Sequence, residues 1–275
     1  MMRQPLIRAA VAALLITAGT AALSQTSGNP ANGLSKAEEK LRAAVAATTR
    51  TPANVARDRH RHPAETLAFF GVDPGDTVVE LWPGGGWYTE ILGPYLADAG
   101  TLYVVPPAGR YTDTITTRLL GSPVYGRVKV ATFTPGQATG IPAGSADVIL
   151  TFRNVHNWLG GDAPIAPAVF AEAYRVLKPG GTLGVVEHRL PESADAVREK
   201  ESGYVKTSTV RRLAEQAGFR FVEASEINAN PKDTADWPDG VWTLPPNLRL
   251  KDVDREKYLA IGESDRMTLK FVKPE

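Results

Sequence analysis

The chain has 275 residues, of which 43% are hydrophobic and 22% are charged, and this is the composition of an ordinary globular protein. The net charge of +1 gives no electrostatic reason to expect a nucleic acid or an acidic partner. The absence of cysteine excludes disulfides, cysteine-ligated zinc, iron–sulfur clusters and a thiol nucleophile.

Residues 1–24 have the pattern of a secretory signal peptide. Two arginines precede an apolar run from Ala9 to Ala18, and Ala22-Leu23-Ser24 offers small residues at a cleavage site. The run is too short for a comfortable permanent membrane span. We therefore expect a periplasmic or secreted protein without stable membrane insertion after signal cleavage. An uncleaved anchor is the alternative.

Residues 25–50 are expected to form a polar linker and then a helix over Lys36 to Thr48, where Ser35 and Glu38 have capping-box spacing. Residues 51–275 are expected to form an α/β domain. Its first part, Arg57 to Pro63, holds two of the four histidines. This charged segment is either a solvated surface or a lid over a ligand. Pro63 is placed to begin a helix that ends before Gly71.

The stretch from residue 77 to 95 organises the rest of the domain. Thr77 to Leu81 is predicted to be a buried strand, Pro83-Gly84-Gly85-Gly86 a tight turn, and the residues from Tyr88 a helix that is interrupted or kinked at Gly93-Pro94. Strand, glycine turn and helix together open a nucleotide-binding α/β fold, because glycine lets the backbone approach a ligand closely.

The details of this turn exclude two kinds of ligand site. The P-loop pattern is absent. Thr89 stands where a dinucleotide fingerprint has its third glycine, and the Glu80 carboxylate disfavours a pyrophosphate. Glu80 is better suited to ordered water or a cationic group near the turn.

The remaining pattern alternates strands and helices, so it predicts a mostly parallel, doubly wound, Rossmann-like sheet with helices on both faces. A loop over 153–161 and a polar, proline-rich excursion over 226–265 interrupt the alternation. The expected strands are Thr101–Val105, Arg127–Phe133, Ala146–Phe152, Thr182–His188, Phe219–Ser225 and Arg266–Val272, and the expected helices are Gly109–Leu120, Pro164–Leu177 and Ser208–Ala217.

Polar residues follow several of these strands and are expected to meet at the carboxyl edge of the sheet. Strand four is followed by Arg153, Asn154, His156, Asn157 and Trp158, and strand five ends with Glu187, His188 and Arg189. His156 and His188 are candidate general bases, since the unperturbed histidine pKa lies near neutral pH.

Three motifs resemble the class I S-adenosylmethionine-dependent methyltransferases over about residues 55–225. They are Val79-Glu80-Leu81-Trp82-Pro83-Gly84-Gly85-Gly86, Ser145-Ala146-Asp147-Val148-Ile149, and the run from Ala173 to Leu183 that contains Leu-Lys-Pro-Gly-Gly. The resemblance implies an α/β fold whose last strand, near Arg266–Val272, is antiparallel.

The same resemblance implies S-adenosylmethionine as the cofactor and a small-molecule substrate. It places Gly84 to Gly86 against the methionine part, Glu80 beneath the cofactor, and Arg153 and Asn154 toward the methyl group. The expected cofactor-binding residues are Glu80, Pro83, Gly84, Gly85, Gly86, Trp87, Thr89, Gln137, Arg153 and Asn154. The expected catalytic residues are His156, Arg153 and His188. No metal ligand is assigned.

Two positions depart from the family pattern. In the family an acidic residue after the second strand binds the ribose hydroxyls, but this chain has Val105-Pro106 there. Gln137 occupies the position at which the family often has an aspartate that binds the adenine amine. Both changes predict weaker or altered cofactor binding. An exported enzyme would also lack an obvious supply of a cofactor that is made in the cytosol.

Three functions follow as hypotheses. The first is methyl transfer to a small molecule, in which Trp82, Trp87 and Trp158 could contact the sulfonium or simply pack. The second is a non-catalytic exported protein that binds a small ligand on the same fold. The third is a metal-dependent hydrolase using His60 or His62 with His156, His188 and Glu187, although no tight spacing such as His-x-x-x-His is present.

Overall fold

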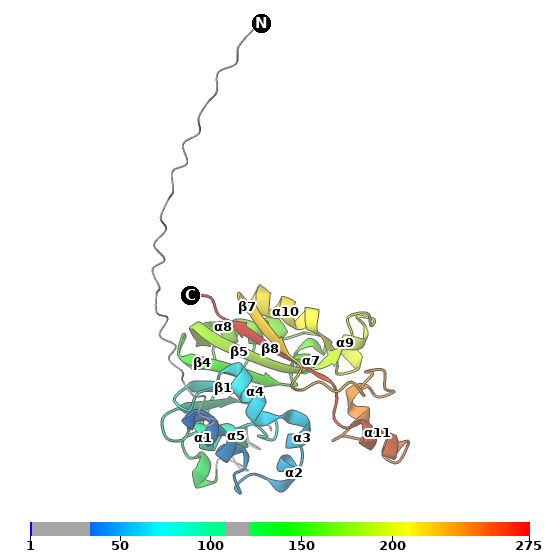
Figure 1. Ribbon diagram of the computed structural model, residues 1–275, viewed down its shortest axis with the longest axis horizontal. Helices are drawn as coiled ribbons and strands as arrows, with labels where there is room; N and C mark the ends of the chain where they lie inside the picture. The colour runs from blue at the N-terminus through cyan, green and yellow to red at the C-terminus, as the bar shows by residue number, and fades with distance from the viewer. Residues whose placement is uncertain (2–33, 108–120) are drawn as a thin grey trace. The chain divides into compact units, whose positions relative to one another are not determined.

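A mixed β-sheet with the strand order β3-β2-β1-β4-β5-β8-β7 carries the fold (Figure 1). The computed structural model describes Met1 and residues 34–107 and 121–275. The predicted signal peptide, most of the linker and the predicted helix Gly109–Leu120 lie outside these residues. The strands are β1 (Thr77–Leu81), β2 (Thr101–Val105), β3 (Lys129–Val130), β4 (Ala146–Phe152), β5 (Leu177–Leu190), β6 (Val205–Lys206), β7 (Arg220–Ser225) and β8 (Arg266–Val272).

The strand order reverses at β1, which fixes where a ligand can enter. β1 pairs in parallel with β2 on one side and with β4 on the other, and β4 pairs in parallel with β5. The connections after β1 and β4 therefore leave the sheet toward opposite faces, and a crevice opens between them. This topology confirms the predicted doubly wound sheet.

β8 lies between β5 and β7 and is antiparallel to both. Its register opposes Thr182 to Val272 at one end and His188 to Arg266 at the other. The predicted antiparallel last strand is therefore confirmed. Because the strand runs backwards, its first residues reach the edge at which the parallel strands end.

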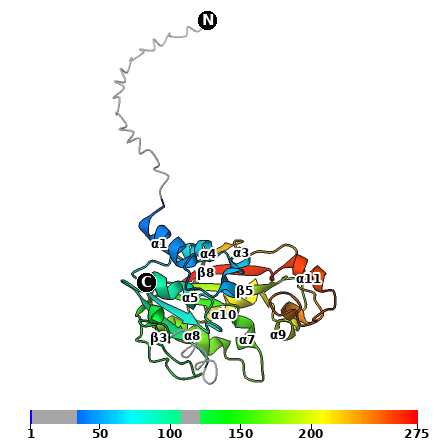
Figure 2. The ribbon, with the colours of Figure 1, turned by 90° about the horizontal axis from the view of Figure 1, so that it is seen from below.

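Helices cover both faces of the sheet (Figures 1 and 2). Alternate residues of each strand point to opposite faces, so Val78 and Val79 of β1 belong to two different hydrophobic cores. One core contains residues of α1 (Lys36–Val45), α4 (Pro63–Phe70) and α5 (Thr89–Leu96). The other contains residues of α7 (Val155–Leu159), α8 (Ala166–Val176) and α10 (Thr207–Gln216).

The N-terminal helices form as their caps predict. The Ser35 hydroxyl accepts from the Glu38 amide while the Glu38 carboxylate accepts from the Ser35 amide, which is the complete capping box. α4 begins at Pro63 and ends before Gly71, whose φ of 73° is left-handed. Between α1 and α4 lie α2 (Pro52–Val55) and α3 (Asp58–Arg61), two single helical turns.

Three local predictions were wrong. The predicted loop over 153–161 contains α7, because the buried Glu187 carboxylate accepts the first amides of this helix from across the fold. The third strand is only Lys129–Val130, since its neighbour β2 runs into prolines that have no N–H to continue the ladder. α5 is not interrupted at Gly93-Pro94 but continues through Pro94, because the apolar side chains around the proline stay buried.

The excursion over 226–265 contains a 3-10 turn, Gly240–Thr243, and α11 (Arg255–Ile261), while α9 (Arg198–Glu201) precedes it. A third hydrophobic cluster joins Tyr204 with Ala235 and Val241, so the excursion packs on the chain that follows β5. Among the described helices, none is long and apolar enough to cross a membrane.

Candidate active site

A cavity of about 330 Å³ opens beside the carboxyl ends of β1, β4 and β5. Pro83, Gly84 and Gly85 line it after β1. Arg153, Asn154 and His156 line it after β4, and His188 lines it near the end of β5. Its other lining residues come from distant segments: Asn54, Arg57 and Arg61 precede β1, while Trp242 and Asn247 belong to the 226–265 excursion.

Two non-glycine residues beside this cavity have left-handed backbone conformations. Trp82 has φ of 51° and Arg153 has φ of 62°, and each directly follows a parallel strand. The Trp82 amide donates to Val105 O at 2.9 Å, and the Arg153 amide donates to Val186 O at 2.6 Å. Each strand thus keeps one more ladder bond and then turns sharply. Such strain, on the order of 1–3 kcal/mol for each residue, gathers at functional sites.

Asn154 joins the two strands that flank the crevice. Its Nδ2 donates to Leu81 O at 3.1 Å, to Trp82 O at 3.1 Å and to Thr151 Oγ1 at 3.0 Å. The side chain is 8% exposed. Asn154 therefore fixes the spacing between the glycine turn and the residues after β4.

The glycine turn is closed by a hydrogen bond from the Gly86 amide to Pro83 O. Gly84 has φ of 59°, and a Cβ placed there would meet no atom within 4 Å, so a side chain at this position would project into open space. Glycine therefore keeps the backbone of the turn accessible to a ligand.

Glu80 and Thr89 lie behind this turn and do not line the cavity. Thr89 Oγ1 donates to Glu80 Oε2 at 2.6 Å, which ties the start of α5 to β1. Burial raises the pKa of Glu80 from 4.5 to about 7, and the single hydrogen bond from Thr89 lowers it only in part.

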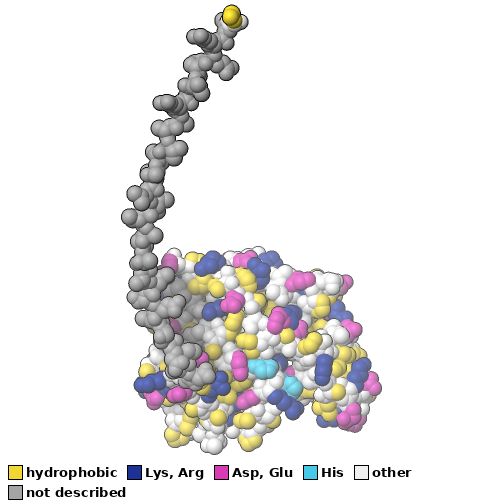
Figure 3. Space-filling model, viewed as in Figure 1, with side chains coloured by type: hydrophobic (Ala, Val, Ile, Leu, Met, Phe, Trp, Pro, Cys, Tyr) yellow, Lys and Arg dark blue, Asp and Glu magenta, His cyan; other side chains and the backbone are white. Residues whose placement is uncertain are grey.

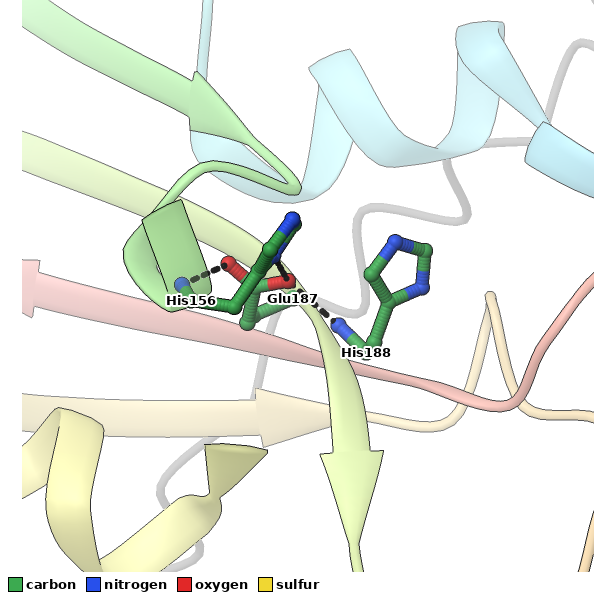
Figure 4. A group of neighbouring side chains, drawn as sticks. All are labelled: His156, Glu187 and His188. Atoms are coloured by element: carbon green, nitrogen blue, oxygen red, sulfur yellow. Dashed lines mark hydrogen bonds and ion pairs between the residues drawn. The ribbon is translucent and has the colours of Figure 1, made fainter. Parts of the chain in front are cut away.

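The carboxylate of Glu187 lies between two histidines (Figure 4). Oε1 faces His156 Nδ1 at 3.0 Å and accepts from the His188 amide at 2.8 Å. Oε2 accepts from the amides of Val155 at 2.5 Å and His156 at 3.3 Å. Because a carboxylate only accepts, Nδ1 of His156 must carry the proton, and its Nε2 keeps a free lone pair.

His188 stands beside this pair, with its ring centroid 5.3 Å from that of His156. Its Nδ1 lies 2.5 Å from Ser264 Oγ. Burial first, then the neighbouring His156 ring and the charges of Arg153 and two further arginines, lower the pKa of His188 well below its usual value. His188 is therefore a neutral imidazole at neutral pH.

His156, Glu187 and His188 could be considered as a metal site, because their ligand atoms all lie within 4.8 Å of one another. However, each Glu187 oxygen already faces two N–H donors. The cavity beside them is lined by three arginines, which repel a cation. The geometry favours an oriented imidazole base over a metal ligand set.

Eight residues predicted from sequence meet in this cavity, and four lie elsewhere. Those that line it are Pro83, Gly84, Gly85, Trp87, Arg153, Asn154, His156 and His188. Glu80, Gly86 and Thr89 lie beside or behind the turn, and Gln137 is exposed on the loop after β3. The segment Arg57–Pro63, for which a solvated surface and a lid were both predicted, borders the cavity through Arg57 and Arg61.

Sequence reasoning missed the residues that the excursion contributes, such as Trp242 and Asn247. It also missed Ser264 and Glu263, which precede β8. No local pattern marks Trp242 and Asn247 as cavity residues, whereas Glu263 and Ser264 do not line the cavity themselves but contact Arg61 and His188, which do.

Comparison with known proteins agrees with this geometry. Residues 80–185 match the family model of a methyltransferase domain. A solved SAM-dependent methyltransferase from Aquifex aeolicus is similar with a TM-score of 0.56 and 16% identity, over 86% of this chain and 98% of that one. A search of curated protein sequences found no match.

Two further structures share the fold. A protein from Galdieria sulphuraria, provisionally assigned as a sarcosine dimethylglycine methyltransferase, has a TM-score of 0.56 and 14% identity, over 81% of this chain and 88% of that one. The cyclase SpnF has the same TM-score and identity, over 86% of this chain and 92% of its own. At these identities, the similarities establish the shared fold alone.

Proposed function

We propose that this protein is a class I S-adenosylmethionine-dependent methyltransferase, which transfers the methyl group of S-adenosylmethionine to a small molecule bound in the cavity. One observation carries the proposal. The glycine turn after β1 and the His156–Glu187 pair open into the same cavity, at the point where the strand order reverses.

The residues present fit the methionine part of the cofactor. Gly84 leaves its backbone open to a ligand, and Asn154 holds the neighbouring strand ends in place. When bound, the cofactor supplies an activated methyl group, so the protein mainly has to position the acceptor. In this proposal Pro83, Gly84 and Gly85 hold the methionine part, and Arg153 and Asn154 border the reacting centre.

His156 is the general base of the proposed reaction. Glu187 holds the proton on Nδ1, so Nε2 can accept a proton from a hydroxyl or amine of the acceptor. The carboxylate also stabilises the imidazolium that this transfer forms. Neutral His188 orients the acceptor by hydrogen bonding and does not carry the second ring proton that an imidazolium acid would donate.

The adenosine part has fewer recognisable partners. Val105 is buried at the end of β2 and Gln137 is exposed, and neither provides a carboxylate for a ribose. The proposed reaction therefore uses weaker adenosine contacts than the family pattern. We propose that the reaction takes place in the periplasm or outside the cell, as the N-terminal sequence pattern predicts, and the cofactor would have to be delivered there.

A second candidate function is ligand binding or another reaction on the same fold. The missing ribose carboxylate favours it, and a cyclase already shares this architecture. The two candidates differ in whether the chain binds S-adenosylmethionine.

Calorimetric titration of the purified chain with S-adenosylmethionine and S-adenosylhomocysteine tests the proposal. We expect dissociation constants on the order of micromolar. Gly84→Val should weaken both by at least about tenfold, because its side chain enters the cavity, whereas Gly75→Val, in the exposed turn before β1, should not. No binding of either ligand at millimolar concentration would refute methyl transfer and favour the second candidate.

A second experiment tests the base. With a methyl-labelled donor and a small-molecule extract as the source of acceptors, His156→Gln should lower label transfer by about 100-fold or more. Its affinity for S-adenosylhomocysteine should stay within about twofold. Transfer at the parent rate would exclude His156 as the base.

A further inference from the structure

Three arginines from distant parts of the chain line the cavity. Arg57 precedes the single turn of α3, Arg61 is the last residue of that turn, and Arg153 directly follows β4. Arg61 is only 2% exposed, and its guanidinium lies over the Trp87 ring, 4.8 Å from the centroid. This stacking fixes the plane of the guanidinium beside the cavity.

Several donors of these arginines have no hydrogen-bond partner among the described residues. Arg61 Nε donates to Glu263 Oε2 at 3.1 Å, but its Nη1 and Nη2 are both buried without an acceptor. Arg57 Nε donates to Glu263 Oε1 at 2.6 Å, and its Nη2 is likewise buried and unpaired. Buried donors of an ionised group are costly to leave unpaired, so an acceptor is expected there.

The charges around these groups do not balance. Burial raises the pKa of Glu263, but Arg61, Arg266, Arg153 and Arg57 outweigh it and hold the value at about 2. One carboxylate therefore faces four guanidinium groups. Arg266 is satisfied by Glu263 and by the carbonyl oxygens of Ser264 and His60, so the surplus falls on the three arginines that line the cavity.

The pKa values of Arg153 and Arg61 are also lowered in this environment. Burial lowers the pKa of Arg153 to about 10, with neighbouring arginines adding to the effect. Burial and the charge of Arg153 also lower the pKa of Arg61 well below its usual value. Burial is the largest cause of both shifts, and the charge of Glu263, which raises both pKa values, does not offset it.

The excess of positive charge is confined to the cavity. The whole chain has a net charge of +1, and on the face shown in Figure 3 acidic and basic side chains are interspersed. A water molecule would satisfy the unpaired donors but would not offset the charge, and a metal cation would be repelled. An oxyanion would both accept hydrogen bonds from the unpaired donors and offset the positive charge, because its oxygens accept in the planar, bidentate geometry that arginine presents.

We infer that the molecule bound beside the glycine turn carries an oxyanion, a carboxylate or a phosphate, which Arg57, Arg61 and Arg153 hold. Its identification as the methyl acceptor rests on the proposed function. With its anionic group on the arginines, the acceptor presents its hydroxyl or amine to His156 Nε2 in the same cavity.

Calorimetric titrations with inorganic phosphate and with glutarate, at low ionic strength, test this inference and distinguish the two oxyanions. We expect at least one to bind with a submillimolar dissociation constant and to bind equally well when S-adenosylhomocysteine is present. Competition with S-adenosylhomocysteine would overturn the inference, because the arginines would then serve the cofactor carboxylate. Absence of binding by both probes would also overturn it.

Variants separate the cavity arginines from general charge. Arg57→Met removes an arginine whose side chain is 25% exposed and should weaken binding of the probe by at least about tenfold. Arg59→Met removes an exposed arginine of the same turn that does not line the cavity, and should change the affinity by less than about twofold. Equal losses in the two variants would refute a specific site.

Arg61→Met should also abolish binding of the probe. Because Arg61 is buried, circular dichroism must first establish that this variant folds. If the Arg61→Met variant does not fold, the result for Arg57→Met alone tests the inference. The probes also separate this inference from the proposed function. Binding of phosphate or glutarate without any binding of S-adenosylhomocysteine would support the anion site and refute methyl transfer.

Discussion

Replacement of Glu187 by glutamine should destabilise the protein strongly. The carboxylate is 0% exposed and faces four N–H donors, from the amides of Val155, His156 and His188 and from the His156 ring. Glutamine keeps one acceptor oxygen and turns the other into an NH₂ group, so two donors lose their acceptor. Hydrogen bonds to a charged group contribute about 1.5–3 kcal/mol each, so we expect a loss of about 3–6 kcal/mol.

Urea denaturation, followed by circular dichroism, measures this loss. Glu223→Gln is the matched control, because it makes the same chemical change at an exposed position of β7 and should stay within about 0.5 kcal/mol of the parent. Nitrogen NMR of the parent should also find the proton of the His156 ring on Nδ1. A Glu187→Gln variant as stable as the control, or a parent ring protonated on Nε2 alone, would refute this account.

Two other substitutions test the fold around the site. In Glu80→Gln, the loss of stability that the parent suffers as the pH rises from 4.5 to about 7 should disappear, because only the folded parent retains a proton on Glu80 over that range. A pKa difference of about 2.5 units, at about 1.4 kcal/mol per unit, means that the parent loses about 3 kcal/mol between pH 4 and pH 8 that the variant does not lose; parallel curves of unfolding free energy against pH would contradict the burial argument. Gly184→Ala should cost about 1–3 kcal/mol, because its Cβ would lie 2.7 Å from atoms of the Phe70 ring, whereas Gly75→Ala, with no atom within 4 Å, should be neutral in the same denaturation assay.

Much of the fold could be predicted, because the sequence patterns that determine its strands and helices are local. The apolar run before the glycine turn, the capping box at Ser35 and the Pro63 to Gly71 helix all depend on residues that are neighbours in sequence. The order of strands then follows from general rules of α/β connections. These features confirmed the predicted fold with few changes.

The site could be predicted only where its residues follow a parallel strand. The glycine turn, Arg153, Asn154, His156 and His188 satisfy that rule, and the structure brings most of them to one cavity. The roles of Glu187 as a cap for α7 and of Arg61 as a buried cation depend on contacts between segments far apart in sequence. No periodicity or spacing within the chain reports such contacts.

The antiparallel strand β8 explains the most consequential omission. A parallel strand brings its last residues to the ligand edge, so a search of the residues that follow each strand finds them. β8 runs the other way, and its register places Arg266 opposite His188 at that edge. Glu263 and Ser264, which precede β8, therefore reach the arginines and His188. For an inverted strand, the search must cover the residues before the strand. On that rule the sequence offers Glu263 and Asp265 as candidate carboxylates at this edge, and the structure pairs Glu263 with Arg57 and Arg61 and Asp265 with Arg189.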